Sequence, residues 1–169
     1  MALGTVDDVE SPSSRAPQRL RTVASLALLG VLVAAALGAF GPRVAERTTT
    51  ADGWTTSVRY APVSRAGLDL PFTVTVRRPG GFTDDVTIAI TSGYLRILDQ
   101  QSMGPEPAEQ TRDATWTYLT FTAPEGDTLR VDVEAYVRAL RHAGASGRVA
   151  VLDDGRLVAP VDVRTRIAP

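Results

Sequence analysis

From Trp54 to the C-terminus, apolar and polar residues alternate with a period of two. The clearest example is Leu70–Arg77, which places Phe, Val and Val on one face and Thr, Thr and Arg on the other. Such alternation is typical of a β-strand with one face against a core and the other in water. The same pattern predicts further strands at Thr55–Tyr60, Val86–Thr91, Tyr94–Leu98, Thr115–Thr122, Leu129–Arg138, Arg148–Leu152 and Leu157–Ile167.

Turn residues separate these short strands, and no long helical pattern interrupts them. The series predicts a mainly β domain, an antiparallel β-sandwich of immunoglobulin-like or fibronectin-like type. The turn Asp153, Asp154 and Gly155 joins two apolar runs and predicts a tight hairpin. The stretch Asp99–Asp113 lacks the period of two, so we expect it to be a loop that crosses between the sheets.

A different pattern precedes the strands, because the 20 residues of Thr22–Gly41 carry no charge. As a helix they would extend about 30 Å, the thickness of a bilayer hydrocarbon core. A cleaved signal peptide is the alternative, but the apolar run is longer than its usual core of about 7–15 residues. The small residues at its end also make a poor cleavage site. The sequence therefore predicts a retained transmembrane helix within residues 19–42.

The hydropathy pattern divides the rest of the chain around this helix. Residues 1–18 are rich in Ser, Pro, Asp and Arg, which predicts a disordered tail. Residues 43–53 form a predicted polar stalk, and residues 54–169 form the β domain. Arginines flank the span on both sides, and the nearest flank favours a cytoplasmic N-terminus. We expect a single-pass protein of the cell membrane with an extracytoplasmic C-terminal domain.

Gly30, Ala34 and Gly38 recur every four residues along the predicted span. A stripe of small residues lets two helix backbones approach closely, so it predicts a helix–helix interface with a membrane protein or with a second copy of the chain. Small residues make up more than half of the span, so a stripe that arises by chance is the alternative.

Composition removes several classes of function. The 18 basic and 19 acidic residues give a net charge of −1, which argues against binding to nucleic acid. The chain has no cysteine and a single histidine, His142, which excludes disulfides, thiolate chemistry and sites that need two imidazoles. His142 lies in the small-residue segment Arg141–Gly147, which predicts a flexible link. We therefore expect no catalytic residue, no metal and no cofactor.

The remaining polar and aromatic candidates have structural interpretations. The pairs Asp84–Asp85 and Asp153–Asp154 lie in predicted turns, where Asp bonds nearby backbone N–H groups. Asp132 and Glu134 share one face of a predicted strand, and we expect that face to be the solvated one. Trp116 is expected in the core, with a sugar-stacking platform as the alternative.

Three segments, DLPFTVTVRRPGGF, PEGDTLRVDVEAYV and VLDDGRLVAPVDVRT, resemble a group of uncharacterised single-pass membrane proteins of actinobacteria. The likeness extends from about Arg19 onward. Members of that group have an anchor, a stalk of the RTTT type and a β-rich outer domain. The resemblance implies compartment and fold only, and no functional residue carries over. The absence of Lys and Asn fits a GC-rich genome.

These observations favour a non-enzymatic accessory or interaction module of the cell envelope, anchored in the membrane. An envelope polysaccharide-binding module is the alternative, and an enzyme of unfamiliar type is a third hypothesis. Aromatic side chains exposed in a shallow groove would favour sugar binding. A cleft with convergent carboxylates would favour an enzyme, and an exposed apolar edge or loop would favour a protein partner.

Overall fold

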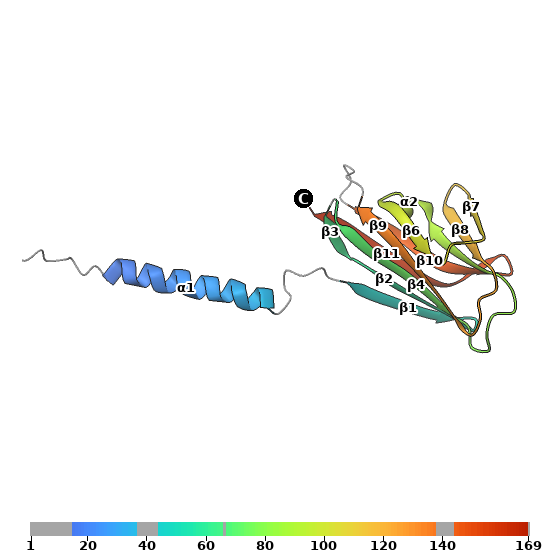
Figure 1. Ribbon diagram of the computed structural model, residues 1–169, viewed down its shortest axis with the longest axis horizontal. Coiled ribbons are helices and arrows are strands. Elements are labelled where there is room, and N and C mark those ends of the chain that lie inside the picture. The colour runs from blue at the N-terminus through green and yellow to red at the C-terminus, as the bar shows by residue number, and fades with distance from the viewer. Residues whose placement is uncertain (1–14, 37–43, 66, 138–143, 169) are drawn as a thin grey trace, which may run out of the picture. The chain divides into compact units, whose positions relative to one another are not determined.

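The computed structural model describes residues 15–36, 44–65, 67–137 and 144–168. The chain divides into two compact units, Met1–Gly41 and Pro42–Pro169. Helix α1 (Arg15–Ala36) belongs to the first unit, and every described strand belongs to the second (Figure 1).

Helix α1 begins at Arg15, inside the segment that the sequence assigned to a disordered tail. The predicted span Thr22–Gly41 continues past its last described residue, Ala36, into residues that lie outside the described part of the chain. In the residues that the structure describes, no helix combines the length and the apolar character that crossing a membrane requires.

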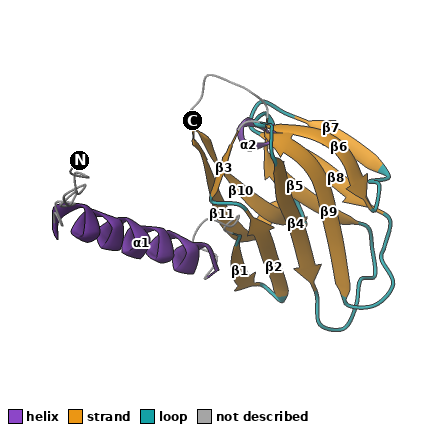
Figure 2. Ribbon diagram, turned by 60° about the vertical axis from the view of Figure 1, so that its left-hand side comes forward, coloured by secondary structure: helices purple, strands orange, loops and turns teal. Residues whose placement is uncertain are grey.

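The strands of the second unit form two sheets (Figure 2). Sheet A is antiparallel and has the strand order β1-β2-β4-β9-β6. Its strands are β1 (Ala45–Ala51), β2 (Trp54–Tyr60), β4 (Asp69–Arg77), β9 (Thr128–Val137) and β6 (Leu98–Gly104).

Sheet B has the order β3-β11-β10-β5-β8-β7. Its pairs are antiparallel except for β3 with β11, which run parallel. Its strands are β3 (Val63–Arg65), β11 (Arg156–Ala168), β10 (Gly144–Asp153), β5 (Val86–Thr91), β8 (Trp116–Phe121) and β7 (Glu109–Arg112). A short helix, α2 (Ser92–Leu95), follows β5.

One hydrophobic core lies between the two sheets. Alternate residues of β4 and β9 point into it from sheet A, and Ile88, Leu119 and Val149 do so from sheet B. The rings of Phe72 and Tyr94 meet there, with their centroids 5.6 Å apart. The period of two in the sequence is thus the pattern of core contacts, and the prediction of a mainly β fold with two sheets is confirmed.

Three segments of the β domain differ from the sequence prediction. Residues 45–51 of the expected stalk form β1, which pairs with β2 along its whole length and so moves the domain boundary toward the N-terminus. The expected strand Tyr94–Leu98 begins in helix α2 and reaches a strand only at Leu98. The expected loop Asp99–Asp113 contains most of β6 and all of β7. Both β1 and β7 are polar edge strands, and such strands lack the alternation that core packing imposes.

The small-residue segment before Arg148 is also a strand, because β10 begins at Gly144. A Cβ atom on Gly147 would lie 2.5 Å from the Cβ of Tyr94, so this glycine makes room for the buried tyrosine ring. The Tyr94 hydroxyl lies 2.8 Å from the hydroxyl of Thr165, and burial raises the pKa of Tyr94 to about 12. His142 lies outside the described residues.

A two-residue turn joins β10 and β11 where the sequence placed a hairpin. Asp153 pairs with Arg156, and Asp154 and Gly155 have φ angles of 46° and 74°. Positive φ at both central residues is the geometry that follows the right-handed twist of two antiparallel strands. Asp153 also accepts a 3.0 Å hydrogen bond from the indole of Trp54, which ties the turn to sheet A.

The turn requires a positive φ angle at Gly155, and a substitution can test this. We expect Gly155→Val to lower the free energy of unfolding by roughly 1–2 kcal/mol, because a β-branched residue is strained at positive φ. A Cβ atom at Gly155 would meet no neighbour within 4 Å, so the cost comes from backbone strain rather than from a clash. Gly155→Asn is the matched control and should cost much less, because Asn tolerates this conformation. Equal stability of the two variants in denaturant unfolding would contradict this account.

Candidate functional site

The outer face of sheet A is covered by polar side chains, as the sequence predicted for Asp132 and Glu134. Neighbouring strands are linked there through hydroxyls, with Thr48 and Ser57 2.7 Å apart. Thr73 donates to Asp132 at 2.8 Å, and Arg130 pairs with the same carboxylate at 2.8 Å. Most of this face is therefore a flat network of satisfied polar groups.

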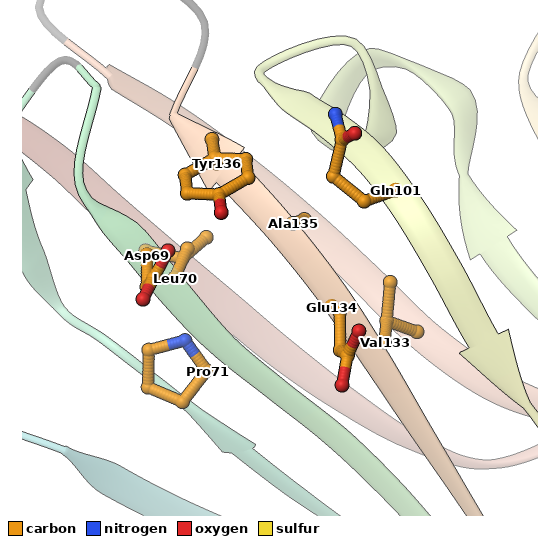
Figure 3. A pocket seen from close by; sticks show the side chains of 8 residues that line it. All are labelled: Asp69, Leu70, Pro71, Gln101, Val133, Glu134, Ala135 and Tyr136. Atoms are coloured by element: carbon orange, nitrogen blue, oxygen red, sulfur yellow. The ribbon is translucent and has the colours of Figure 1, made fainter.

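The flat face is interrupted by a groove over β4, β9 and β6. Its volume is about 430 Å³, within the range of small-molecule sites. Figure 3 shows side chains from β4 on one side, Gln101 of β6 on the other, and residues of β9 between them. The lining residues are Asp69, Leu70, Pro71, Gln101, Val133, Glu134, Ala135 and Tyr136. Because Leu70, Val133 and Ala135 are buried toward the core, the polar and aromatic side chains form its walls.

Two local features of the sheet open this groove. Strand β2 ends at Tyr60, opposite Phe72, so Pro71 lies beyond the last pair of the β2–β4 ladder. Proline cannot donate to a ladder, and this position suits it. On the other side, the register of β6 against β9 shifts between Gln100 and Ser102, which leaves Gln101 as an extra residue. A bulge of this kind bends a strand and redirects a side chain.

Tyr136 gives the groove an aromatic surface. Its side chain is 45% exposed, although tyrosine in a folded domain is usually more buried. It pairs across the ladder with Asp69, while Pro71 pairs with Glu134. The aromatic ring therefore has two carboxylates as neighbours, Asp69 across the ladder on β4 and Glu134 two residues earlier on β9 (Figure 3).

Hydrogen-bond acceptors dominate the polar groups of the groove. Asp69 and Glu134 carry carboxylates, Gln101 an amide and Tyr136 a hydroxyl, and no lining residue is basic. Glu134 accepts a 2.7 Å hydrogen bond from Ser102. Among the described residues, no group of three or more His, Asp or Glu side chains is arranged to hold a metal ion. The groove is thus suited to a ligand that presents O–H or N–H donors.

The basic side chains of the same face act on a different carboxylate. Hydrogen bonds from Arg130, and then from Thr73, lower the pKa of Asp132, with a smaller contribution from the charge of Arg59. This cluster occupies the row of the sheet next to the groove, because Asp132 pairs with Thr73 where Glu134 pairs with Pro71.

Among the described candidate residues of the β domain, Glu134 lines the groove, and the others are not among its lining residues. Gly30 and Ala34 are in α1, and Gly38 lies outside the described residues. Asp153, Asp154 and Gly155 form the β10–β11 turn. Asp85 accepts a 3.0 Å hydrogen bond from the backbone N–H of Ala123, a structural role.

The interpretation of Trp116 as a core residue is wrong. On β8, the buried side chains are Thr117, Leu119 and Phe121, and Trp116 is half-buried on the opposite face. The aromatic residue that does line a groove, Tyr136, was not singled out, because a sequence does not show which strands become neighbours. The sequence did contain one indication, because Tyr136 occupies a solvent-facing position of an alternating strand.

No protein-family model matches this chain, and no curated protein matches it in sequence. Among solved structures, the chain is similar to Pseudomonas fluorescens alkylpurine DNA glycosylase AlkC bound to DNA containing an abasic site analog. The identity is 12% and the TM-score is 0.34, and the match covers 75% of this chain. It covers 31% of the glycosylase chain, so this chain spans less than a third of that protein. A likeness this weak carries no argument about function.

The lowered pKa of Asp132 predicts a pH dependence of stability. Its carboxylate stabilises the fold fully above its ordinary pKa of 3.8, and this contribution disappears as the pH falls through the lowered value in the folded protein. We expect Asp132→Asn to be less stable than the natural chain at pH 7, with a difference that shrinks below about pH 4.

Thermal unfolding between pH 2 and pH 7 measures this difference. Thr73→Val is the comparison variant, because it removes one hydrogen bond to Asp132 and leaves Arg130, the larger cause, in place. Its acid-side slope should stay close to that of the natural chain. A constant gap between Asp132→Asn and the natural chain over this range would refute the linkage.

Proposed function

We propose that this chain is a non-enzymatic, membrane-anchored module of the cell envelope whose outer domain binds a polysaccharide. In this proposal the two packed sheets are a β-sandwich of immunoglobulin-like or fibronectin-like type. The observation that carries the proposal is the exposed Tyr136 in a shallow groove with polar walls. An aromatic side chain exposed in such a groove favours sugar binding over a purely protein-binding role.

The chemistry of the groove supports this ligand class. A sugar ring presents C–H groups on its flat face and hydroxyls around its edge. The ring of Tyr136 offers an apolar surface for the flat face. Asp69, Glu134 and Gln101 offer acceptors for the hydroxyls around it. Such a division between an apolar surface and a few placed polar groups is common in small-molecule sites.

The same groups are poorly placed for hydrolysis of a glycosidic bond. That reaction needs a carboxylic acid whose pKa is raised, usually by burial, facing a second carboxylate across the substrate. The side chains of Asp69 and Glu134 are both exposed, and they come from neighbouring strands of one sheet face. This arrangement supports recognition rather than catalysis.

Anchoring is the second part of the proposal, and it is supported by the uncharged run Thr22–Gly41. We place the N-terminus in the cytoplasm and the β domain outside. Within the membrane, the stripe Gly30, Ala34 and Gly38 would bind a membrane protein or a second copy of the chain.

Anchoring and association can be measured together in native membranes. We expect full-length protein in the membrane fraction, with the β domain open to protease added outside the cell. Replacing Gly30 and Gly38 with Leu should keep the protein in the membrane and reduce its crosslinking to partners, because bulk blocks close backbone approach. A soluble form that starts near Ala39 would contradict anchoring. Crosslinks unchanged by the substitutions would exclude the helix face.

Sugar binding is tested by retention of the full-length protein on insoluble envelope polysaccharide. Tyr136→Ala should weaken retention about tenfold, which corresponds to ~1.4 kcal/mol, because it removes the aromatic surface. Tyr136→Phe should keep most of the retention. Thr75→Ala is the control, because Thr75 lies on the outer face of sheet A, in β4, but does not line the groove. No retention of the natural chain on any envelope polysaccharide would overturn the proposal.

A further inference from the structure

The negative charge of the groove indicates which kind of polysaccharide it would bind. This inference rests on the proposed function. Both ionisable acids of the groove, Asp69 and Glu134, are exposed carboxylates. Among the described residues, neither forms an ion pair with a basic side chain. Two arginines of this face, Arg59 and Arg130, act on Asp132 in the adjacent row. Among the described residues that line the groove, no basic side chain offsets these two negative charges.

The register of the ladder brings these two carboxylates to the same ligand. Asp69 pairs with Tyr136, and Glu134 precedes Tyr136 by two residues on β9. Asp69 and Glu134 are therefore diagonal neighbours on one face, a relation that places such residues about 7–8 Å apart, with their Cβ atoms somewhat closer. An ammonium group between them can donate a hydrogen bond to each carboxylate, because it has three N–H donors.

We infer that the groove prefers an amino sugar with a free ammonium group. The flat face of the sugar ring packs on Tyr136, and its ammonium donates to Asp69 and Glu134. The same charges disfavour a ligand with a carboxylate or a phosphate, because like charges within about 4 Å repel each other even in water. The groove is thus selective by charge as well as by shape.

An exposed ion pair is weak, and this sets the size of the expected effect. One such pair is worth about 0.2–1 kcal/mol, so two of them predict a preference of about fivefold for the amine over a neutral sugar of the same shape. The preference should fall as the salt concentration rises. The apolar contact with Tyr136 is shared by both ligands and should not depend on salt.

The test uses full-length protein in mild detergent and isothermal titration with three trisaccharides. These are a glucosamine trimer with free amines, its fully N-acetylated counterpart and a galacturonic acid trimer. We expect the amine form to bind about fivefold more tightly than the N-acetylated form, and the uronic acid to bind more weakly than both.

Two variants separate charge from shape. Asp69→Asn combined with Glu134→Gln should bring the ratio between the amine and the N-acetylated trimer close to one, because both negative charges are removed. Tyr136→Ala should weaken both ligands together. The substitutions to Asn and Gln keep side-chain size at exposed positions, so they leave the fold intact, and thermal unfolding checks this. A ratio that survives the double substitution would overturn the inference.

The outcomes for this inference and for the proposed function differ. Equal or tighter binding of the N-acetylated or uronic acid trimer overturns the amino-sugar preference and leaves polysaccharide binding standing. Failure of every saccharide, together with no retention on envelope polysaccharide, overturns both. A trilysine peptide is included as a further probe. If it binds more tightly than the glucosamine trimer and competes for the groove, the site is one for basic peptides and the inference is wrong.

Discussion

The register between β4 and β9 determines both the core and the outer surface of this domain. Nine residues of β4 pair in sequence with residues of β9, from Asp69 with Tyr136 to Arg77 with Thr128. In this register, Phe72 and Val133 meet in the core, and Pro71 and Glu134 meet on the outside. A slip of one residue would move every side chain of a strand to the opposite face. Burial of the alternate valines and of Phe72 sets the register of β4 against β9. The core therefore also determines which polar residues lie side by side in the groove.

Sequence alone predicted those parts of the fold that the core dictates. Leu70–Arg77 and Val86–Thr91 alternate because one face of each strand is buried, and both are strands over almost the same residues. The predictions failed for segments whose sequence is not determined by an alternation of buried and exposed side chains. Strand β1 is a polar edge strand whose threonines contact hydroxyls of β2, and a polar run of that kind is indistinguishable in sequence from a stalk. Gly147 looked like a loop residue, but it is glycine because the ring of Tyr94 leaves no room for a side chain.

The groove was harder to predict than the strands, for a related reason. Glu134 was placed on the solvated face by its position in the alternation. Its neighbours Asp69 and Gln101 come from other strands. Gln101 lies at a β-bulge, and no short sequence pattern predicts that bulge. A site assembled across three strands depends on strand order and register, which are properties of the whole sheet.

Strand direction adds a mechanical consequence. Strand β1 begins at Ala45, which pairs with Tyr60 at the same end of sheet A as Phe72 and the groove. Tension between the incoming chain and a molecule held in the groove would cross the strands over about 10–15 Å, rather than run along their length. Such a load would act first on the Ala45 end of the β1–β2 ladder, whereas the hydrogen bond between Trp54 and Asp153 lies at the opposite end. The domain would yield by peeling off its first strand before its core breaks.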